Sequence, residues 1–148
     1  MSTQENKAIV QRFFEEAWNQ NKIAELDAYV AADNVGQSGI VVRPLGPEAI
    51  RTNIKVWRTA FPDYQAHVEQ LIAEGDMVVA RITFTGTHTG TFQLGPRVLA
   101  PTGKALREAQ LLLFRIADGK IVELRSTWDR LSVLEQLGAL PEPAPAPR

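Results

Sequence analysis

Residues 106–128, LREAQLLLFRIADGKIVELRSTW, contain the hairpin that decides the fold. The apolar run 106–116 predicts one strand, and residues 121–128 predict its antiparallel partner. Between them, Ala117-Asp118-Gly119 predicts a tight turn, with Gly119 suited to a left-handed backbone conformation. The sequence therefore predicts a long antiparallel pair near the end of the chain.

The two faces of this hairpin differ in composition. If the turn contains three residues, Ile116 faces Lys120, and this pairing decides which side chains share a face. One face then carries Glu108, Gln110, Leu112, Phe114, Val122, Leu124, Ser126 and Trp128. A two-residue turn would shift the pairing by one position and exchange the partners. We interpret this face as a pocket lining, because it combines apolar walls with a few polar groups.

Two more strands are predicted before the hairpin, over residues 64–72 and 78–88. Apolar and polar side chains alternate in both, which is typical of strands with one buried face. In the first strand the inward-facing residues are expected to be Tyr64, Ala66, Val68 and Ile72. Residues 89–103 contain Gly and Pro and predict a loop. A short final helix carries Leu131, Leu134 and Leu137 and ends at Gly138.

Helical patterns occupy the first third of the chain. The apolar stripe of the first helix is Ile9, Val10, Phe13, Phe14, Ala17 and Trp18, with Ser2 and Glu5 in capping-box spacing. A short second helix is expected to turn Ile23, Leu26, Ala28, Tyr29 and Val30 inward. Residues 31–45 predict a loop with at most one brief strand. A third helix begins at Pro47 and ends before Pro62.

Helices followed by a run of strands predict an α+β fold. We expect a curved antiparallel sheet wrapped by the N-terminal helices into a cone with an internal pocket. Residues 1–140 form a single domain in this interpretation. The segment 141–148, PEPAPAPR, has nothing to bury and is predicted to be a disordered tail.

Composition excludes several kinds of chemistry. The 148 residues include no cysteine, which removes disulfides, thiol nucleophiles and thiolate metal sites. Two histidines far apart give no metal-ligand set, so no metal is expected. A formal net charge of -1 argues against nucleic-acid binding. Without a signal segment or an apolar run of membrane length, we expect a cytoplasmic protein that does not bind membranes.

Six short motifs carry a resemblance to a known family. They are NKAIVQRFFEEAWN at 6–19, GPEAIR at 46–51, AFPD at 60–63, GTHTG at 86–90, FRIADGKIVE at 114–123 and WDRL at 128–131. With these motifs the chain resembles the SnoaL-like polyketide cyclases of the nuclear transport factor 2-like superfamily (cystatin-like cones), from about residue 5 to 138. The resemblance implies the cone fold, no cofactor, and a homodimer packed through sheet faces. An apolar outer face with Ala109, Leu111 and Leu113 also favours the dimer.

The resemblance further implies acid–base catalysis by an Asp and a His inside the cone. This sequence departs from that pattern at three positions. Leu112 stands where a His is usual, Ser126 where the acid is expected, and Gln37 where another His is frequent. The chain therefore lacks the family's usual acid–base pair in this matching.

Three other residues are candidate catalytic groups, each with a structural alternative. Glu108 is a lone carboxylate among apolar strand residues, and burial would raise its pKa into a useful range. Its alternative is a salt bridge with Arg107 or Arg125. His88 is either a general base or a hydrogen-bonding residue at a strand end. Asp129 is either an acid or the N-cap of the last helix.

Eight residues are candidates for substrate binding: Trp18, Gln37, Trp57, Tyr64, Gln110, Arg125, Ser126 and Trp128. The predicted function is a cofactor-independent cyclase or isomerase acting on a polyketide-like or other apolar small molecule. Ring closure would proceed by acid–base catalysis, or by the shape of the cone in a pericyclic-type reaction. A non-catalytic binding module is the main alternative. Epoxide hydrolysis, with Arg125 and Asp129 as a partial match to an Asp-Arg-Asp site, is another.

Overall fold

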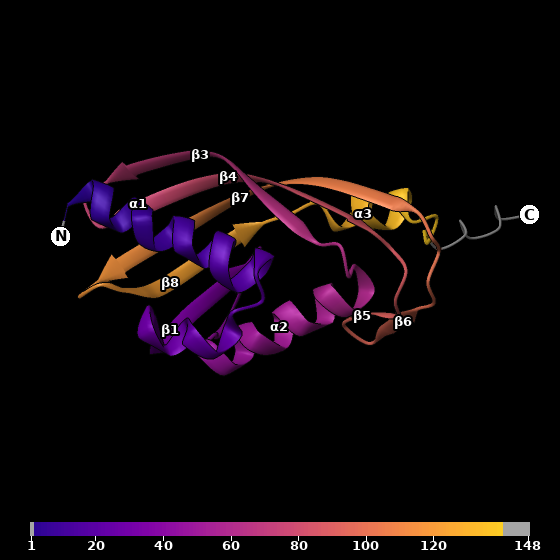
Figure 1. The fold of residues 1–148 in the computed structure, drawn as a ribbon, viewed down its shortest axis with the longest axis horizontal. Helices are drawn as coiled ribbons and strands as arrows, with labels where there is room; N and C mark the ends of the chain where they lie inside the picture. Colours follow the sequence, from indigo (N-terminus) through magenta and orange to yellow (C-terminus); the bar gives the residue numbers. More distant parts are fainter. Residues whose placement is uncertain (1, 141–148) are drawn as a thin grey trace, which may run out of the picture.

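The computed structural model describes residues 2–140, built around one curved six-stranded sheet (Figure 1). Its strands are β1 Val30–Ser38, β2 Val41–Pro44, β3 Gln65–Glu74, β4 Met77–Thr87, β7 Ala105–Ala117 and β8 Lys120–Thr127. Their spatial order is β2-β1-β8-β7-β4-β3. Neighbouring strands are antiparallel, except that β1 and β8 run parallel. The predicted α+β class is confirmed, and the predicted tail at 141–148 lies outside the described residues.

The helices cover the side toward which the sheet curves (Figure 1). They are α1 Thr3–Arg12, η1 Phe13–Asn19, η2 Ile23–Ala28, α2 Pro47–Ala60 and α3 Arg130–Gln136. Strands β3, β4 and β7 arch over α2, while α3 and the small β5–β6 hairpin lie at the end of the molecule opposite the N-terminus. This arrangement forms the predicted cone.

The first helix changes its winding in the middle. Ser2 caps α1 by accepting a hydrogen bond from the Glu5 N–H at 3.0 Å, as the capping-box spacing predicted. At Phe13 the chain continues as the π-helix η1, whose wider turns the apolar periodicity did not predict. The side chains of Phe13, Phe14, Ala17 and Trp18 are all buried in this segment. The wider winding therefore serves the packing of large aromatic side chains.

The segment from 23 to 45 differs from the expected short helix and loop. Residues 23–28 form a 3-10 helix, and Ala28 is exposed rather than turned inward. Residues 31–45 were expected to be mostly loop, but they form the strands β1 and β2. Parallel pairing with β8 supplies the backbone partners of β1 that the local sequence does not reveal. The prediction of a loop here is therefore wrong.

Strand β3 contains a bulge that reverses its faces. The pairing with β4 shifts between Val68 and Gln70, and an inserted residue changes which side chains point inward. Ile72, expected to face the core, is therefore 56% exposed, while Leu71 and Ala73 are half-buried. The alternation predicted for residues 64–68 is correct, and the inward position predicted for Ile72 is wrong.

The decisive hairpin contains two compensating irregularities. Ala117 pairs with Lys120, so the turn has two residues, Asp118 and Gly119, both with positive φ. The predicted pairing of Ile116 with Lys120 is therefore wrong. A register shift between Arg115 and Ile116 then moves the pairing by one more residue, so that even-numbered residues of the two strands again lie on the same face. Glu108, Gln110, Leu112 and Phe114 consequently share a face with Leu124 and Ser126, as predicted.

The loop predicted at 89–103 contains regular structure. Strands β5 Phe92–Leu94 and β6 Arg97–Leu99 form a separate two-stranded sheet. Phe92 is fully buried, and Leu94 and Leu99 are nearly so. These apolar anchors fix the small hairpin against the main core. No helix in the described part of the chain is long and apolar enough to span a membrane.

Candidate active site

A cavity of about 540 Å³ lies between the sheet and the helices. Its walls come from every layer of the cone: η1, β1, β2, α2, β4, β5, β7 and β8. This volume lies within the range of small-molecule binding sites. The internal pocket predicted from the order of elements is therefore present.

Trp57 is the centre of one aromatic wall. Its ring on α2 lies 4.9 Å from the ring of Phe92, 5.3 Å from that of Phe84, 5.6 Å from that of Trp128 and 5.8 Å from that of Phe61. These residues come from four separate parts of the chain. Because aromatic pairs in such geometries pack rigidly, this side of the cavity has a fixed shape.

A second aromatic wall is a stack of three rings. Tyr64 lies between Trp18 of η1, at 4.9 Å, and Phe84 of β4, at 4.2 Å. All three side chains line the cavity. Burial holds the pKa of the Tyr64 hydroxyl far above its usual value, and the nearby Glu108 carboxyl adds to that shift. Tyr64 therefore stays neutral and serves as a wall with one polar atom.

Polar side chains reach the cavity from several elements, among them β1, β2, α2, β7 and β8. Gln110 is half-buried there, and Ser126 lies on the neighbouring strand. Gln37 of β1 also lines the cavity, while its amide donates to the Gly39 carbonyl at 2.9 Å. Seven of the eight predicted binding residues therefore line one cavity: Trp18, Gln37, Trp57, Tyr64, Gln110, Ser126 and Trp128.

The eighth residue, Arg125, is not in the cavity lining. Its side chain is 55% exposed and forms an ion pair with Glu123. Glu123 also binds Arg115 at 3.1 Å. Desolvation alone would raise the pKa of this carboxyl, but the hydrogen bonds and charges of the two arginines together outweigh it and lower the pKa. Arg125 therefore belongs to a surface charge network. The partial match of Arg125 and Asp129 to an epoxide-opening site finds no support, since Arg125 pairs with Glu123 and Asp129 caps α3.

The two main departures from the family pattern are direct neighbours. Leu112 on β7 and Ser126 on β8 are cross-strand partners, and both line the cavity. Where the resemblance implies a His and an acid, the structure thus places an isobutyl group beside a hydroxyl. Neither side chain exchanges protons near neutral pH. The cavity wall at this point can shape or hydrogen-bond a substrate, but it holds no acid–base pair.

Glu108 lies behind the cavity wall rather than in it. Only 3% of the residue is exposed, and it is not among the lining residues. Gln110, which does line the cavity, donates from Nε2 to Glu108 Oε2 at 3.0 Å. Burial raises the pKa of Glu108 to about 7, with the Gln110 amide and the Asp129 backbone N–H opposing the shift. The alternative salt bridge with Arg107 or Arg125 is not formed.

Asp129 is the N-cap of α3. Its side-chain oxygen Oδ1 accepts from the Ser132 N–H at 2.9 Å. The residue is exposed and does not line the cavity. The sequence left two interpretations of Asp129 open, a catalytic acid and a helix N-cap, and its position is that of the N-cap.

His88 lies fully buried at the end of β4, outside the cavity lining. Its Nδ1 is hydrogen-bonded with Thr102 Oγ1 at 3.0 Å and accepts from the Thr102 N–H at 3.3 Å. The ring packs 5.4 Å from that of Phe61. Burial lowers the pKa of His88, so the imidazole stays neutral. These contacts describe a structural hydrogen-bonding residue that joins the end of β4 to the segment before β7.

Sequence reasoning missed several polar residues of the lining. Arg43 of β2, Asn53 of α2 and Arg130 at the start of α3 all contribute to it. Arg43 was hidden because its segment was predicted to be a loop. Arg130 comes two residues after the predicted lining residue Trp128, and this short separation was the one sequence signal that it lies near the cavity. Among the described residues no group of three His, Asp or Glu side chains has a metal-binding arrangement.

A curved sheet closed by helices around a cavity with aromatic walls and several polar groups defines a cone fold of the nuclear transport factor 2-like class. The sequence model of the SnoaL-like polyketide cyclases matches residues 8–137. The chain therefore belongs to the SnoaL-like polyketide cyclase family, as the motifs predicted.

Individual relatives agree with this assignment. The aklanonic acid methyl ester cyclase DnrD of Streptomyces peucetius is 32% identical over 99% of this chain and 97% of its own length. The cyclase of the same name, DauD, from Streptomyces sp. strain C5 is 31% identical over 89% of this chain and 80% of its own. TsrD from Streptomyces laurentii has a solved structure that superposes with a TM-score of 0.80, at 27% identity over 95% and 99% of the two chains.

Proposed function

We propose that this chain is a cofactor-independent cyclase that closes a ring in a polyketide-like, largely apolar molecule held in the cavity. The observation that carries the proposal is the aromatic cavity with Gln110 and Ser126 on its sheet wall, in a chain 32% identical to a cyclase. Such a cavity favours a flat, unsaturated substrate with a few oxygen atoms.

Ring closure of this kind is an isomerisation and needs no co-reactant. In an aldol-type closure a carbon gives its proton to a water molecule, and the electron pair left on that carbon forms the bond to a carbonyl carbon of the same molecule. The carbonyl oxygen becomes an oxyanion, which takes the proton back from that water molecule. Gln110 and Ser126 can donate hydrogen bonds to that oxygen from β7 and β8, which lowers the barrier where charge develops.

The aromatic walls provide the second contribution. The rings around Trp57 and the stack of Trp18, Tyr64 and Phe84 leave a fixed space. A flexible substrate that enters this space is held with its reacting carbons close together, which can remove several kcal/mol from the barrier. A pericyclic closure would use this contribution alone. Because Leu112 and Ser126 stand in place of an acid–base pair, we expect the shape of the cavity to account for a large part of the lowering of the barrier.

Aklanonic acid methyl ester, the substrate in the names of two relatives, is the first compound to assay. We expect Trp57→Ala to lose at least about 100-fold in kcat/KM, since it removes the centre of one wall. We expect Glu108→Gln to lose less than about tenfold, because Glu108 lies behind the wall. A loss of about two orders of magnitude or more in Glu108→Gln would instead assign proton transfer to this residue. Glu74→Gln, at the exposed end of β3, is the matched control.

A non-catalytic binding module remains the second candidate, and the pair Leu112 and Ser126 is the observation that favours it. A module of this kind would bind the substrate in the cavity without turnover. Tryptophan fluorescence separates the two, since Trp18, Trp57 and Trp128 line the cavity. Saturable quenching by aklanonic acid methyl ester without any product would support the module and contradict the cyclase.

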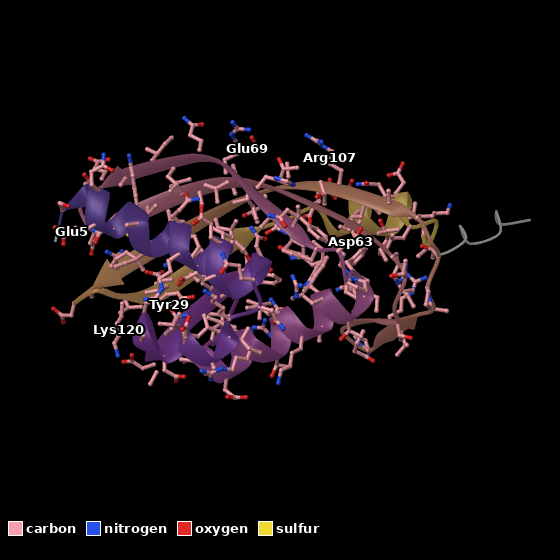
Figure 2. The ribbon with its side chains drawn as sticks, in the orientation of Figure 1. Glu5, Tyr29, Asp63, Glu69, Arg107 and Lys120 are labelled. Atoms are coloured by element: carbon pink, nitrogen blue, oxygen red, sulfur yellow. The ribbon has the colours of Figure 1, made fainter. Side chains whose placement is uncertain are left out.

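We also propose that the chain forms a homodimer through the outer face of the sheet. Leu111 is 56% exposed on that face, next to the exposed Ala109. Figure 2 shows Glu69 of β3 and Arg107 of β7 also projecting outward from this side. An apolar centre with a charged rim is typical of interfaces. Light scattering should give a dimer mass for the wild type and a monomer mass for Leu111→Lys. The expected cytoplasmic location stays a prediction.

A further inference from the structure

Glu108 is a buried carboxyl with an incomplete set of partners. It is 3% exposed, opposite Phe84 of the neighbouring strand β4. Its Oε2 accepts from Gln110, and the Asp129 backbone N–H lies near enough to lower its pKa, but Oε1 forms no hydrogen bond of ordinary length within residues 2–140. A buried polar atom without a partner carries a free-energy cost, and a native protein retains such an atom for a reason. The reason suggested by the geometry is its neighbour Gln110.

Gln110 connects this hidden carboxyl to the cavity. One end of its carboxamide contacts Glu108, and the residue lines the cavity where Glu108 does not. A carboxamide has two different ends: the NH2 group only donates, and the carbonyl oxygen only accepts. Whichever end faces Glu108, the other end is the one offered to a ligand.

The charge of Glu108 selects between these ends. An ionised carboxylate only accepts, so it holds the NH2 end of Gln110 and turns the carbonyl toward the cavity. A neutral carboxyl also carries a donor, so it can bind the Gln110 carbonyl and leave the NH2 group to the ligand. The structure shows the first of these arrangements, with Nε2 facing Glu108.

We propose that Glu108 is a positioning residue, whose protonation decides whether Gln110 presents a donor or an acceptor to the ligand in the cavity. The inference rests on the proposed function only in placing the substrate in this cavity. A substrate oxyanion requires donors, so the form with neutral Glu108 is the one suited to ring closure. Glu108 therefore acts through Gln110 and does not itself touch the substrate.

The surroundings of Glu108 allow this titration near neutral pH. Burial raises its pKa to about 7, and the charge of Asp129 at the start of α3 adds to the rise. Tyr64, from the segment before β3, lies near enough for the Glu108 charge to act on its hydroxyl and stays neutral, and Arg58 of α2 acts on the same hydroxyl in the opposite direction. No Lys or Arg forms an ion pair with Glu108 among the described residues. Both charge states are therefore accessible between about pH 6 and 8.

Three tricyclic probes of one size test the proposal without any turnover. Fluorenone carries a carbonyl that only accepts, fluorenol a hydroxyl that also donates, and fluorene no polar atom. Binding is followed by tryptophan fluorescence at pH 6 and pH 8.5. We expect fluorenone to bind roughly three- to tenfold more tightly at pH 6 than at pH 8.5, because one hydrogen bond contributes about this much to affinity. Fluorenol should change less, and fluorene should bind equally at both pH values.

Two variants separate a positioning role from direct contact. In Glu108→Gln the pH dependence of fluorenone binding should disappear, because residue 108 no longer titrates. In Gln110→Met it should disappear as well, because the connection to the cavity is removed. Loss in Glu108→Gln but not in Gln110→Met would show that Glu108 contacts the ligand itself, which overturns the proposal. Persistence in both variants would overturn it too.

Folding failure of one variant does not remove the test. Thermal melting establishes whether each variant is folded, and Gln110→Met, at a half-buried site, tests the connection alone if Glu108→Gln does not fold. In the wild type, the side-chain ¹⁵N resonance of Gln110 should shift with pH with the same midpoint as fluorenone binding. An unshifted resonance would contradict the proposal. These readouts are binding and spectroscopic, so they stand whether or not the chain turns over aklanonic acid methyl ester.

Discussion

Asn19 and Ala66 form a reciprocal pair of hydrogen bonds that joins the end of η1 to the edge strand β3. Asn19 Nδ2 donates to the Ala66 carbonyl at 2.8 Å, and the Ala66 N–H donates to Asn19 Oδ1 at 2.7 Å. The carboxamide thus replaces a neighbouring strand at one residue of the sheet edge. It also fixes the position of Trp18, which precedes it and lines the cavity.

Substitution Asn19→Ala should destabilise the fold by about 2 kcal/mol, because it leaves both the N–H and the carbonyl of buried Ala66 without a partner. Chemical denaturation measures this loss. The neighbouring exposed residue offers a control, and Gln20→Ala should stay within about 0.5 kcal/mol of the wild type. Equal stability of the two variants would show that the pair contributes nothing to folding.

The N-cap at Asp129 leads to a second prediction. Asp129→Asn should keep the stability and the turnover of the wild type, because Asn caps a helix as well as Asp does. Asp129→Ala should lose about 1 kcal/mol of stability, since the hydrogen bond to the Ser132 N–H is removed. A 100-fold loss of kcat in a fully stable Asp129→Asn variant would restore the catalytic interpretation of this residue.

Glu108 should make the stability of the wild type depend on pH. Its pKa rises from an ordinary value of 4.5 to about 7 on folding, so between these pH values the native state holds a proton that the unfolded state releases. This contribution is fully present below pH 4.5 and is lost as the pH rises through about 7. The loss amounts to roughly 3 kcal/mol.

Urea denaturation of the wild type and of Glu108→Gln between pH 5 and pH 8 measures this contribution. The difference in free energy of unfolding should move in favour of the variant as the pH rises, because Gln carries no charge at any pH. Groups that titrate in both proteins cancel in the comparison. Two parallel curves would mean that Glu108 titrates at the same pH in the folded and unfolded states.

The main helices, the strands β3, β4, β7 and β8 and most of the aromatic lining could be predicted from the sequence, because these features depend on local periodicity. The candidate binding residues Gln110 and Ser126 were correctly placed on one face, although the predicted turn was wrong. A two-residue turn exchanges the faces, and the irregularity between Arg115 and Ile116 exchanges them back. A bulge leaves little trace in the side-chain pattern, so its effect on parity cannot be predicted from that pattern.

Features that depend on distant partners were not predictable in the same way. Strand β1 pairs in parallel with β8, and β2 pairs with β1, although β1 itself contains Asp33, Asn34 and Gly36. The burial of Glu108 was foreseen as an alternative, but its place behind Gln110 follows from the curvature of the sheet. The alternation along a strand predicts which face of the sheet a side chain lies on, whereas its burial depends on the residues from other elements that pack over it.

Gly90 gives the last prediction, and it concerns the closest backbone contact at the wide end of the cone. A Cβ atom at this residue would lie 1.8 Å from the Thr59 carbonyl oxygen near the end of α2. The Gly90 N–H donates to the Ala60 carbonyl at 3.1 Å, so the two backbones are held together as well as close. An alanine here requires the segment after β4 to move away from α2.

That movement would disturb the aromatic wall, since Phe92 follows two residues later and packs against Trp57. We expect Gly90→Ala to lose at least about 2 kcal/mol of stability, in line with strained or overpacked sites. Its binding of fluorene, measured by tryptophan fluorescence, should weaken as well. Thr91→Ala, at the exposed neighbouring position, should change neither quantity. A Gly90→Ala variant with wild-type melting and binding would show that α2 and the β4–β5 segment can separate without disturbing the cavity.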